Sequence, residues 1–244
     1  MLSAVAIQYE WIHGPLASPE FVAECSVLYS RHYGKWSECS PTAPGENVRL
    51  SSSRIRDLLV DGSVIAFARL DDELIGYAIA VQNKSVRGTI SWVTQLVVHK
   101  DYRNRNIGKS LLFSIWTFSN HYAWGLITAS PFAIRALEKA TRRRCDPLKI
   151  QRNQTLLYNH GCRHIDYVES SDQPIISENG SKINTHFFVD HSDVPQMVKS
   201  VESAKTPWVL GEIEEGYEWF AFTFQDQPQI QLSSDEIAGM VDAS

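Results

Sequence analysis

Residues 94–113 read TQLVVHKDYRNRNIGKSLLF. The stretch begins as an apolar run, continues through a polar turn and enters a helical pattern at Ile107 and Gly108. The first N–H groups of a helix lack intrahelical acceptors and lie at the positive end of its dipole, so they bind phosphate groups readily. The positive side chains, which suit a pyrophosphate, are Arg103, Arg105 and Lys109. The stretch therefore predicts a strand, an anion-binding turn and a helix.

A P-loop is one possible interpretation of this turn. Its pattern is G-x-x-x-x-G-K-[ST], and Gly108, Lys109 and Ser110 supply the last three positions. The first glycine would fall at position 103, which is occupied by Arg103. The spacing therefore disfavours a nucleotide hydrolase.

The same stretch resembles motif A of the GNAT acetyltransferase superfamily, L-x-V-x-P-x-Y-R-[GN]-x-G-I-G-x-x-L-L. The matching positions are Leu96, Val98, Tyr102, Arg103, Asn104, Ile107, Gly108, Leu111 and Leu112. Lys100 replaces the usual proline, and Asn106 replaces the first glycine of the motif core. Asparagine tolerates a left-handed backbone better than most residues, so we expect the turn to keep its shape. A generic basic strand–turn–helix is the remaining alternative, and the matches in register disfavour it.

In this family, motif A binds acetyl-CoA through the backbone of a splayed strand edge and through the loop and helix start. The resemblance implies pantetheine contacts at Leu96, Val97 and Val98, with an oxyanion donor near Val98. It implies phosphate contacts along the loop and helix start, at Arg103, Asn104, Arg105, Asn106, Ile107, Gly108, Lys109 and Ser110.

The familiar catalytic groups of the family are missing. One branch has a glutamate base on this strand, where Trp92 stands, and many members have a tyrosine acid in the last core helix, where Leu137 stands. Histidines titrate near neutral pH, so the replacement candidates are His32, His99 and His121. A structural or surface role explains each of these histidines as well, so the catalytic residues stay unassigned.

Aromatic residues cluster in LYSRHYGKW, residues 28–36. In the family this region walls the acceptor pocket, which makes Tyr29, Tyr33 and Trp36 candidate substrate-binding residues. Ordinary core packing explains the cluster equally well.

The order of predicted elements also resembles the GNAT core. It implies an α/β (α+β) fold with a mixed, mostly antiparallel central sheet flanked by helices and a C-terminal α/β extension. We expect helices at 18–32, 53–59, 107–119 and 131–141, and strands at 64–70, 74–82, 90–99 and 125–129.

The remainder of the chain is less regular. We expect a helix over 148–160, and two strands at 164–169 and 183–189 that could complete the sheet. Beyond them the sequence predicts a helix over 194–203, a buried core strand over 217–224 and a short terminal helix. We therefore predict a GNAT domain over 1–190, with its recognisable core at 18–145, and an extension over 191–244 packed on it. The extension could also complete the acceptor pocket or form a homodimer contact.

Composition limits the function classes. A net charge of -5 and a pI near 5.9 disfavour a nucleic-acid partner. The four cysteines show no metal-ligand spacing, and we expect no metal. The N-terminus lacks the pattern of a signal peptide, and no apolar stretch is long enough for a membrane span, so we expect a cytoplasmic protein without a membrane partner.

The sequence therefore predicts an acyltransferase that moves an acetyl group directly from acetyl-CoA to an amine of a small-molecule or protein acceptor. Trp92 and Leu137 favour one alternative, a catalytically degenerate module that binds acyl-CoA or a partner protein without turnover. An enzyme acting on aminoacylated RNA is a second alternative, which the acidic composition disfavours.

Overall fold

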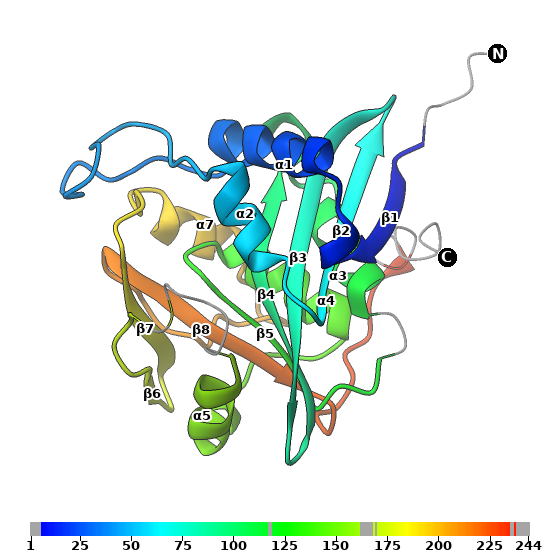
Figure 1. Ribbon diagram of the computed structural model, residues 1–244. Helices are drawn as coiled ribbons and strands as arrows, with labels where there is room; N and C mark the ends of the chain where they lie inside the picture. The colour runs from blue at the N-terminus through cyan, green and yellow to red at the C-terminus, as the bar shows by residue number, and fades with distance from the viewer. Residues whose placement is uncertain (1–5, 117–118, 162–167, 169, 235–236, 238–244) are drawn as a thin grey trace.

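The computed structural model describes residues 6–116, 119–161, 168, 170–234 and 237. One eight-stranded sheet organises these residues, in the order β1-β2-β3-β4-β5-β8-β7-β6 (Figure 1). The strands are β1 (Gln8–His13), β2 (Ser63–Leu70), β3 (Glu73–Ser85), β4 (Gly88–Val98), β5 (Ala123–Thr128), β6 (Ile175–Ser177), β7 (Gly180–Phe187) and β8 (Gly216–Phe224). β4 and β5 run parallel, and the other neighbouring strands run antiparallel. The predicted mixed, mostly antiparallel sheet is confirmed.

Helices cover both faces of the sheet. α1 and α2 lie on the face nearest the viewer in Figure 1, and α3 and α4 lie behind the strands. The helices of the described residues are α1 (Pro19–His32), α2 (Ser52–Leu58), α3 (Ile107–Trp116), α4 (Pro131–Thr141), α5 (Pro147–Gly161) and α7 (Val194–Val201), with short 3-10 turns η1 (Gly14–Leu16) and η2 (Lys100–Tyr102). No described helix combines the length and apolar character needed to cross a membrane.

Serine caps fix three helix starts, each within one residue of the predicted start. Ser18, Ser51 and Ser130 each accept a hydrogen bond from the backbone N–H three residues later. Such a bond satisfies a donor that the helix itself leaves unpaired, typically contributing about 1 kcal/mol. Local sequence therefore determines where α1, α2 and α4 begin.

Two hydrophobic clusters hold the layers together. Beneath α1 and α2, Cys25 and Tyr29 pack with Tyr77 and Val97 of the sheet. The larger cluster includes Leu111 and other residues of α3 and α4 on the opposite face and continues to β8. The helices therefore cover the two sides of β3 and β4.

The C-terminal part of the chain completes the sheet instead of lying outside it. β8 pairs with β5 on one side and with β7 on the other. The predicted strand at 217–224 is confirmed, and the predicted strand at 183–189 overlaps β7, which pairs with β6 and β8. Of the predicted strand at 164–169 the structure describes only Val168, which is helical, and the other five residues lie outside the described ones. The boundary at residue 190 stays a prediction, although the sheet includes strands from both sides of it.

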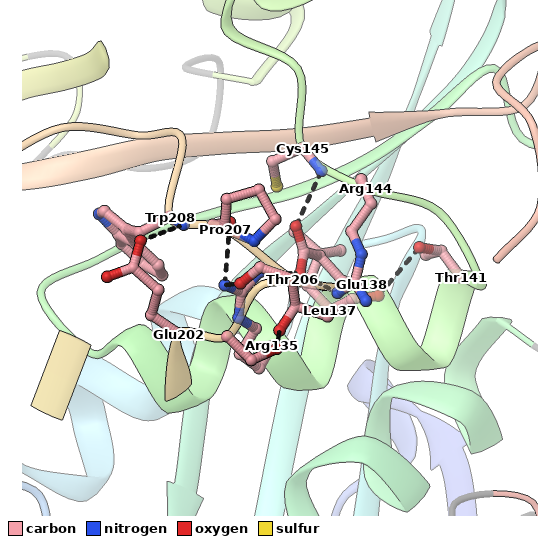
Figure 2. A network of polar contacts seen from close by, with 11 residues as sticks. Arg135, Leu137, Glu138, Thr141, Arg144, Cys145, Glu202, Thr206, Pro207 and Trp208 are labelled. Carbon is pink, nitrogen blue, oxygen red and sulfur yellow. Dashed lines mark hydrogen bonds and ion pairs between the residues drawn. The ribbon is translucent and has the colours of Figure 1, made fainter. Parts of the chain in front are cut away.

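A buried ionic cluster attaches the segment before β8 to α4 (Figure 2). Glu138 accepts hydrogen bonds from Arg135 Nη1 at 2.6 Å, Arg144 Nη1 at 2.7 Å and Cys145 N–H at 3.0 Å. Arg135 Nη2 also donates to the carbonyl oxygen of Thr206 at 2.8 Å. One side chain of α4 is therefore bonded both to its own helix and to the chain that leads into β8.

Candidate functional site

The central feature of the site is the place where β4 and β5 part. Their parallel pairing ends at Val93 and Leu126, although β4 continues to Val98 and β5 to Thr128. On its other side β5 pairs with β8 along its whole length. The last residues of β4 therefore have a strand neighbour, β3, on one side and an unpaired edge on the other, and we call the place where β4 and β5 part the opening.

A bulge lies at the start of this opening. Ile79 pairs with Gln95 and Ala80 with Val93, so Thr94 is the extra residue on β4. A bulge bends its strand and increases the local twist. Thr94 also donates its hydroxyl to the carbonyl oxygen of Ile79 at 3.3 Å. The bulge thus bends β4 immediately beyond its last pairing with β5.

The hydrogen-bond ladder determines which backbone groups face the opening. His99 N–H donates to the carbonyl oxygen of Ile75 at 2.8 Å, and bonded and non-bonded pairs alternate along an antiparallel ladder. The next bonded pair is therefore Val97 with Tyr77. It follows that Leu96 and Val98 direct their N–H groups away from β3 and toward the opening, whereas Val97 directs its N–H toward β3.

The loop after β4 contains two left-handed residues. Asn104 and Asn106 have φ values of 63° and 62°. Asparagine is among the few non-glycine residues that adopt this conformation readily. The expectation that asparagine would support this turn in place of glycine is confirmed. The loop then enters α3, where Ser110 N–H makes an intrahelical bond to the carbonyl oxygen of Asn106 at 3.0 Å.

The first turn of α3 presents its backbone toward this loop. Ile107 and Gly108 precede the first i to i−4 bond, so their N–H groups lack acceptors within the helix. A Cβ on Gly108 would lie 3.7 Å from Ala136 Cβ, an ordinary contact distance. The structure therefore provides the helix N-terminus that the sequence predicts.

The three basic side chains of the loop have different surroundings. Arg103 donates to the carbonyl oxygens of His32 and, at 3.3 Å, of Val98, and partial burial lowers its pKa. Arg105 is exposed and lies over the Tyr102 ring. Lys109 is only 2% exposed. The Arg103 side chain joins the end of α1 to the end of β4 while remaining exposed to solvent, as Arg105 is.

Two of the three candidate histidines lie together. The rings of His32, at the end of α1, and His99, after β4, have centroids 3.8 Å apart. Burial, followed by the charge of His99 and of Lys100, lowers the pKa of His32. His32 Nδ1 accepts from Lys100 N–H at 3.4 Å, and His99 Nδ1 accepts from Asp101 N–H at 3.2 Å. Each ring therefore has one nitrogen engaged with the backbone of the loop.

These two histidines line a cavity of about 680 Å³ beside α1. Its wall combines acidic and basic side chains of α1 and the β2–β3 hairpin, among them Glu20, Glu24, Arg31, Arg69 and Asp72. Among the residues that the structure describes, no group of three or more histidine, cysteine or acidic side chains is placed to hold a metal ion.

The third candidate, His121, is separated from the other two. It precedes the N-terminal end of β5, whereas His99 follows the C-terminal end of β4. Because β4 and β5 are parallel, these two positions lie at opposite ends of the strands. Burial lowers the pKa of His121.

The predicted aromatic cluster forms, but its rings pack against one another. Tyr29 and Tyr33 stack with centroids 4.3 Å apart, and Trp36 contacts Phe187 of β7 edge-on at 5.0 Å. Tyr29 is buried, which raises its pKa. Tyr33 and Trp36 are half-buried, so parts of their rings remain accessible.

A carboxyl group that sequence reasoning missed lies close to this cluster. Glu218 of β8 is 4% exposed, accepts a hydrogen bond from Thr185 Oγ1 at 2.9 Å and accepts another from Ala129 N–H. Burial raises its pKa to about 7. The available signal was a glutamate within the apolar strand segment YEWFAFTF, in phase with Phe220 and Phe222.

The two family positions without an acid or base are core positions. Trp92 and Leu137 are fully buried, and the Trp92 ring contacts Phe220 and Phe222 of β8. Neither position can supply a proton donor or acceptor of the familiar type.

Comparison with known proteins identifies the region that contains this site. Residues 27–127, from α1 to β5, match the model of the Acetyltransferase (GNAT) family. A search of the curated proteins gives no match.

Solved structures give distant likenesses. A ribosomal-protein-alanine N-acetyltransferase from Brucella melitensis is 20% identical, with 45% of this chain and 69% of that chain covered and a TM-score of 0.32. A GNAT-family acetyltransferase from Streptococcus pneumoniae is 18% identical, with coverage of 54% and 83% and a TM-score of 0.39. Arabidopsis thaliana NAA60, solved with a bisubstrate analogue, is 21% identical, with coverage of 55% and 82% and a TM-score of 0.38.

Proposed function

Because residues 27–127 match the model of the GNAT acetyltransferase family, we propose that this protein transfers an acetyl group from acetyl-CoA directly to an amine of a small-molecule or protein acceptor. The observation that carries the proposal is the left-handed turn and helix start placed directly after the half of β4 that β5 leaves unpaired. The protein would act in the cytoplasm, without a nucleic-acid or membrane partner.

The acyl donor would lie along the opening and end at the loop. The N–H groups of Leu96 and Val98 point away from β3 and would bond the pantetheine or the acetyl oxygen, which favours these residues over Val97. The N–H groups of Ile107 and Gly108 suit the pyrophosphate, with charge added by Arg105. Arg103 would hold the loop in shape, since its side chain is bonded to backbone carbonyls.

Acetyl-CoA binding tests the proposal directly. We expect micromolar affinity by calorimetry, and a loss of at least about tenfold in Gly108→Glu because a negative side chain would face the pyrophosphate. Gly108→Gln, which has similar volume without the charge, should lose less affinity. If the unaltered protein did not bind acetyl-CoA, the proposal would be withdrawn.

A binding module without turnover is the second candidate function, and buried Trp92 and Leu137 favour it. The two functions differ in one measurement, the release of free CoA thiol in the presence of primary amines. A polyamine, an amino sugar and a short peptide with a free α-amino group form a suitable panel. Binding of acetyl-CoA without thiol release above the hydrolytic background would favour the module.

A further inference from the structure

We propose that Glu218 is the general base of this acetyl transfer, accepting the proton of the acceptor amine at the opening between β4 and β5. The inference rests on the proposed function. It assigns the role to β8, from a part of the chain that lies beyond the matched residues 27–127.

Sheet topology places Glu218 at the same end of the sheet as the C-terminal ends of β4 and β5. Its neighbour Trp219 pairs with Thr128, the last residue of β5, and Ala129 N–H directly after β5 donates to the Glu218 carboxylate. β5 has already separated from β4 at this level, since their pairing ends at Leu126. Glu218 therefore lies across the opening from the last residues of β4.

The packing of α1 places Glu218 near the end of β4. The carboxylate of Glu218 contributes, after burial, to the raised pKa of Tyr29, so the two groups are close in space. Tyr29 in turn packs in one cluster with Val97 of β4 and stacks on Tyr33. Glu218 therefore lies on the α1 side of the sheet, next to the aromatic residues predicted to wall the acceptor pocket.

The surroundings of Glu218 suit proton transfer more than a structural role. The partners found for its carboxylate are the Thr185 hydroxyl and the Ala129 N–H, both neutral, and none of the ion pairs in the described part of the chain includes it. A buried carboxylate without a counter-cation is costly, and a neutral glutamine could make similar hydrogen bonds. A proton acceptor that changes state near neutral pH explains why a carboxyl group occupies this position.

The step balances as follows in atoms and electrons. The amine nitrogen forms a bond to the acetyl carbonyl carbon, the carbon–sulfur bond breaks, and its electron pair leaves with the CoA sulfur. The proton lost by the nitrogen passes to the Glu218 carboxylate and then to solvent or to the thiolate. The products are the acetylated amine and CoA, with Glu218 again ionised.

Glu218→Gln is the principal test, with thiol release measured on the amine panel and acetyl-CoA affinity measured by calorimetry. We expect kcat to fall on the order of a hundredfold or more, with acetyl-CoA affinity unchanged and the inflection of the pH–rate profile near 7 lost. Glu214→Gln, the same substitution at an exposed position of the preceding segment, should leave kcat and the profile unchanged.

Thr185→Val provides a second and independent readout. The hydroxyl of Thr185 lowers the pKa of Glu218, so its removal should move the inflection to higher pH while kcat at alkaline pH is retained. An unshifted inflection would overturn the inference, and it would do so even if Glu218→Gln failed to fold.

The remaining outcomes separate the two proposals. If Glu218→Gln kept kcat within about threefold, or raised only KM, Glu218 would not be the base, while the acetyltransferase proposal would stand. If the unaltered protein did not bind acetyl-CoA, the proposed function would fail and this inference with it.

Discussion

The raised pKa of the buried Glu218 side chain makes the stability of the fold depend on pH. Its pKa is about 7 in the folded protein and 4.5 in the unfolded chain, so between these values the native state holds a proton that the unfolded state has released. Stability contributed by this group is therefore fully present below pH 4.5 and is lost as pH rises through 7.

We predict that Glu218→Gln removes this pH dependence. Relative to the variant, the unaltered protein should lose on the order of 3 kcal/mol of unfolding free energy between the two pKa values. Urea denaturation of both proteins at several pH values between 4 and 8 would measure the difference. If the unfolding free energies of the two proteins changed equally with pH, folding would not raise the pKa of Glu218.

Asn106 supports the loop through its backbone conformation. We predict that Asn106→Gly changes the unfolding free energy by less than about 1 kcal/mol, because glycine also adopts a positive φ. Asn106→Val should cost about 1–3 kcal/mol, since a β-branched residue is strained there. Thermal unfolding measures both effects.

A control separates backbone strain from loss of the amide side chain. Asn47 is exposed and its φ is not in the left-handed region, so Asn47→Val should be nearly neutral. Equal losses at positions 47 and 106 would contradict the strain argument.

At the scale of elements, the cluster around Glu138 joins α4 to the segment that leads into β8 (Figure 2). Removing one member of a buried ionic cluster leaves the others desolvated and unpaired. We predict that Glu138→Gln lowers the unfolding free energy by about 3–5 kcal/mol, measured by urea denaturation. A loss below about 1 kcal/mol would indicate that solvent reaches the two arginines.

An exposed ion pair provides the matched comparison. Glu214 pairs with Lys182 at 2.6 Å on the surface. Glu214→Gln should therefore cost no more than about 1 kcal/mol, because water screens this pair in the folded state and replaces it in the variant.

At the scale of the whole molecule, β8 packs tightly against the matched region at Gly125. A Cβ at this position of β5 would overlap the ring of Phe222 on β8. We predict that Gly125→Ala costs about 1–3 kcal/mol or more through overpacking, and that Phe222→Leu in the same protein recovers part of this loss. Denaturant unfolding of the two single variants and the double variant measures the coupling.

Gly108→Ala is the control for the general effect of replacing glycine. Its added Cβ would make only ordinary contacts, so stability should change little. Additive losses for Gly125→Ala and Phe222→Leu would show that the two strands are not in the close contact described above.

Local sequence signals specify the short-range features of the molecule. Serine caps, apolar periodicity and the hairpin at Asp71 and Asp72 identify the elements from α1 to α4, because each signal acts over a few neighbouring residues. The conformation of the turn before α3 could also be predicted from sequence, since Asn104 and Asn106 favour left-handed positions without tertiary contacts.

Which distant segments pair with one another depends on long-range contacts that become visible in the folded structure. β1 was not predicted, because its short segment shows little alternation and is ordered by pairing with β2. The place of β8 between β5 and β7 depends on pairing across long stretches of chain, which no local pattern encodes. Glu218 is an example. In the sequence it is a charged residue within an apolar strand segment, and the pairing of β8 with β5 brings it close to the opening beside β4.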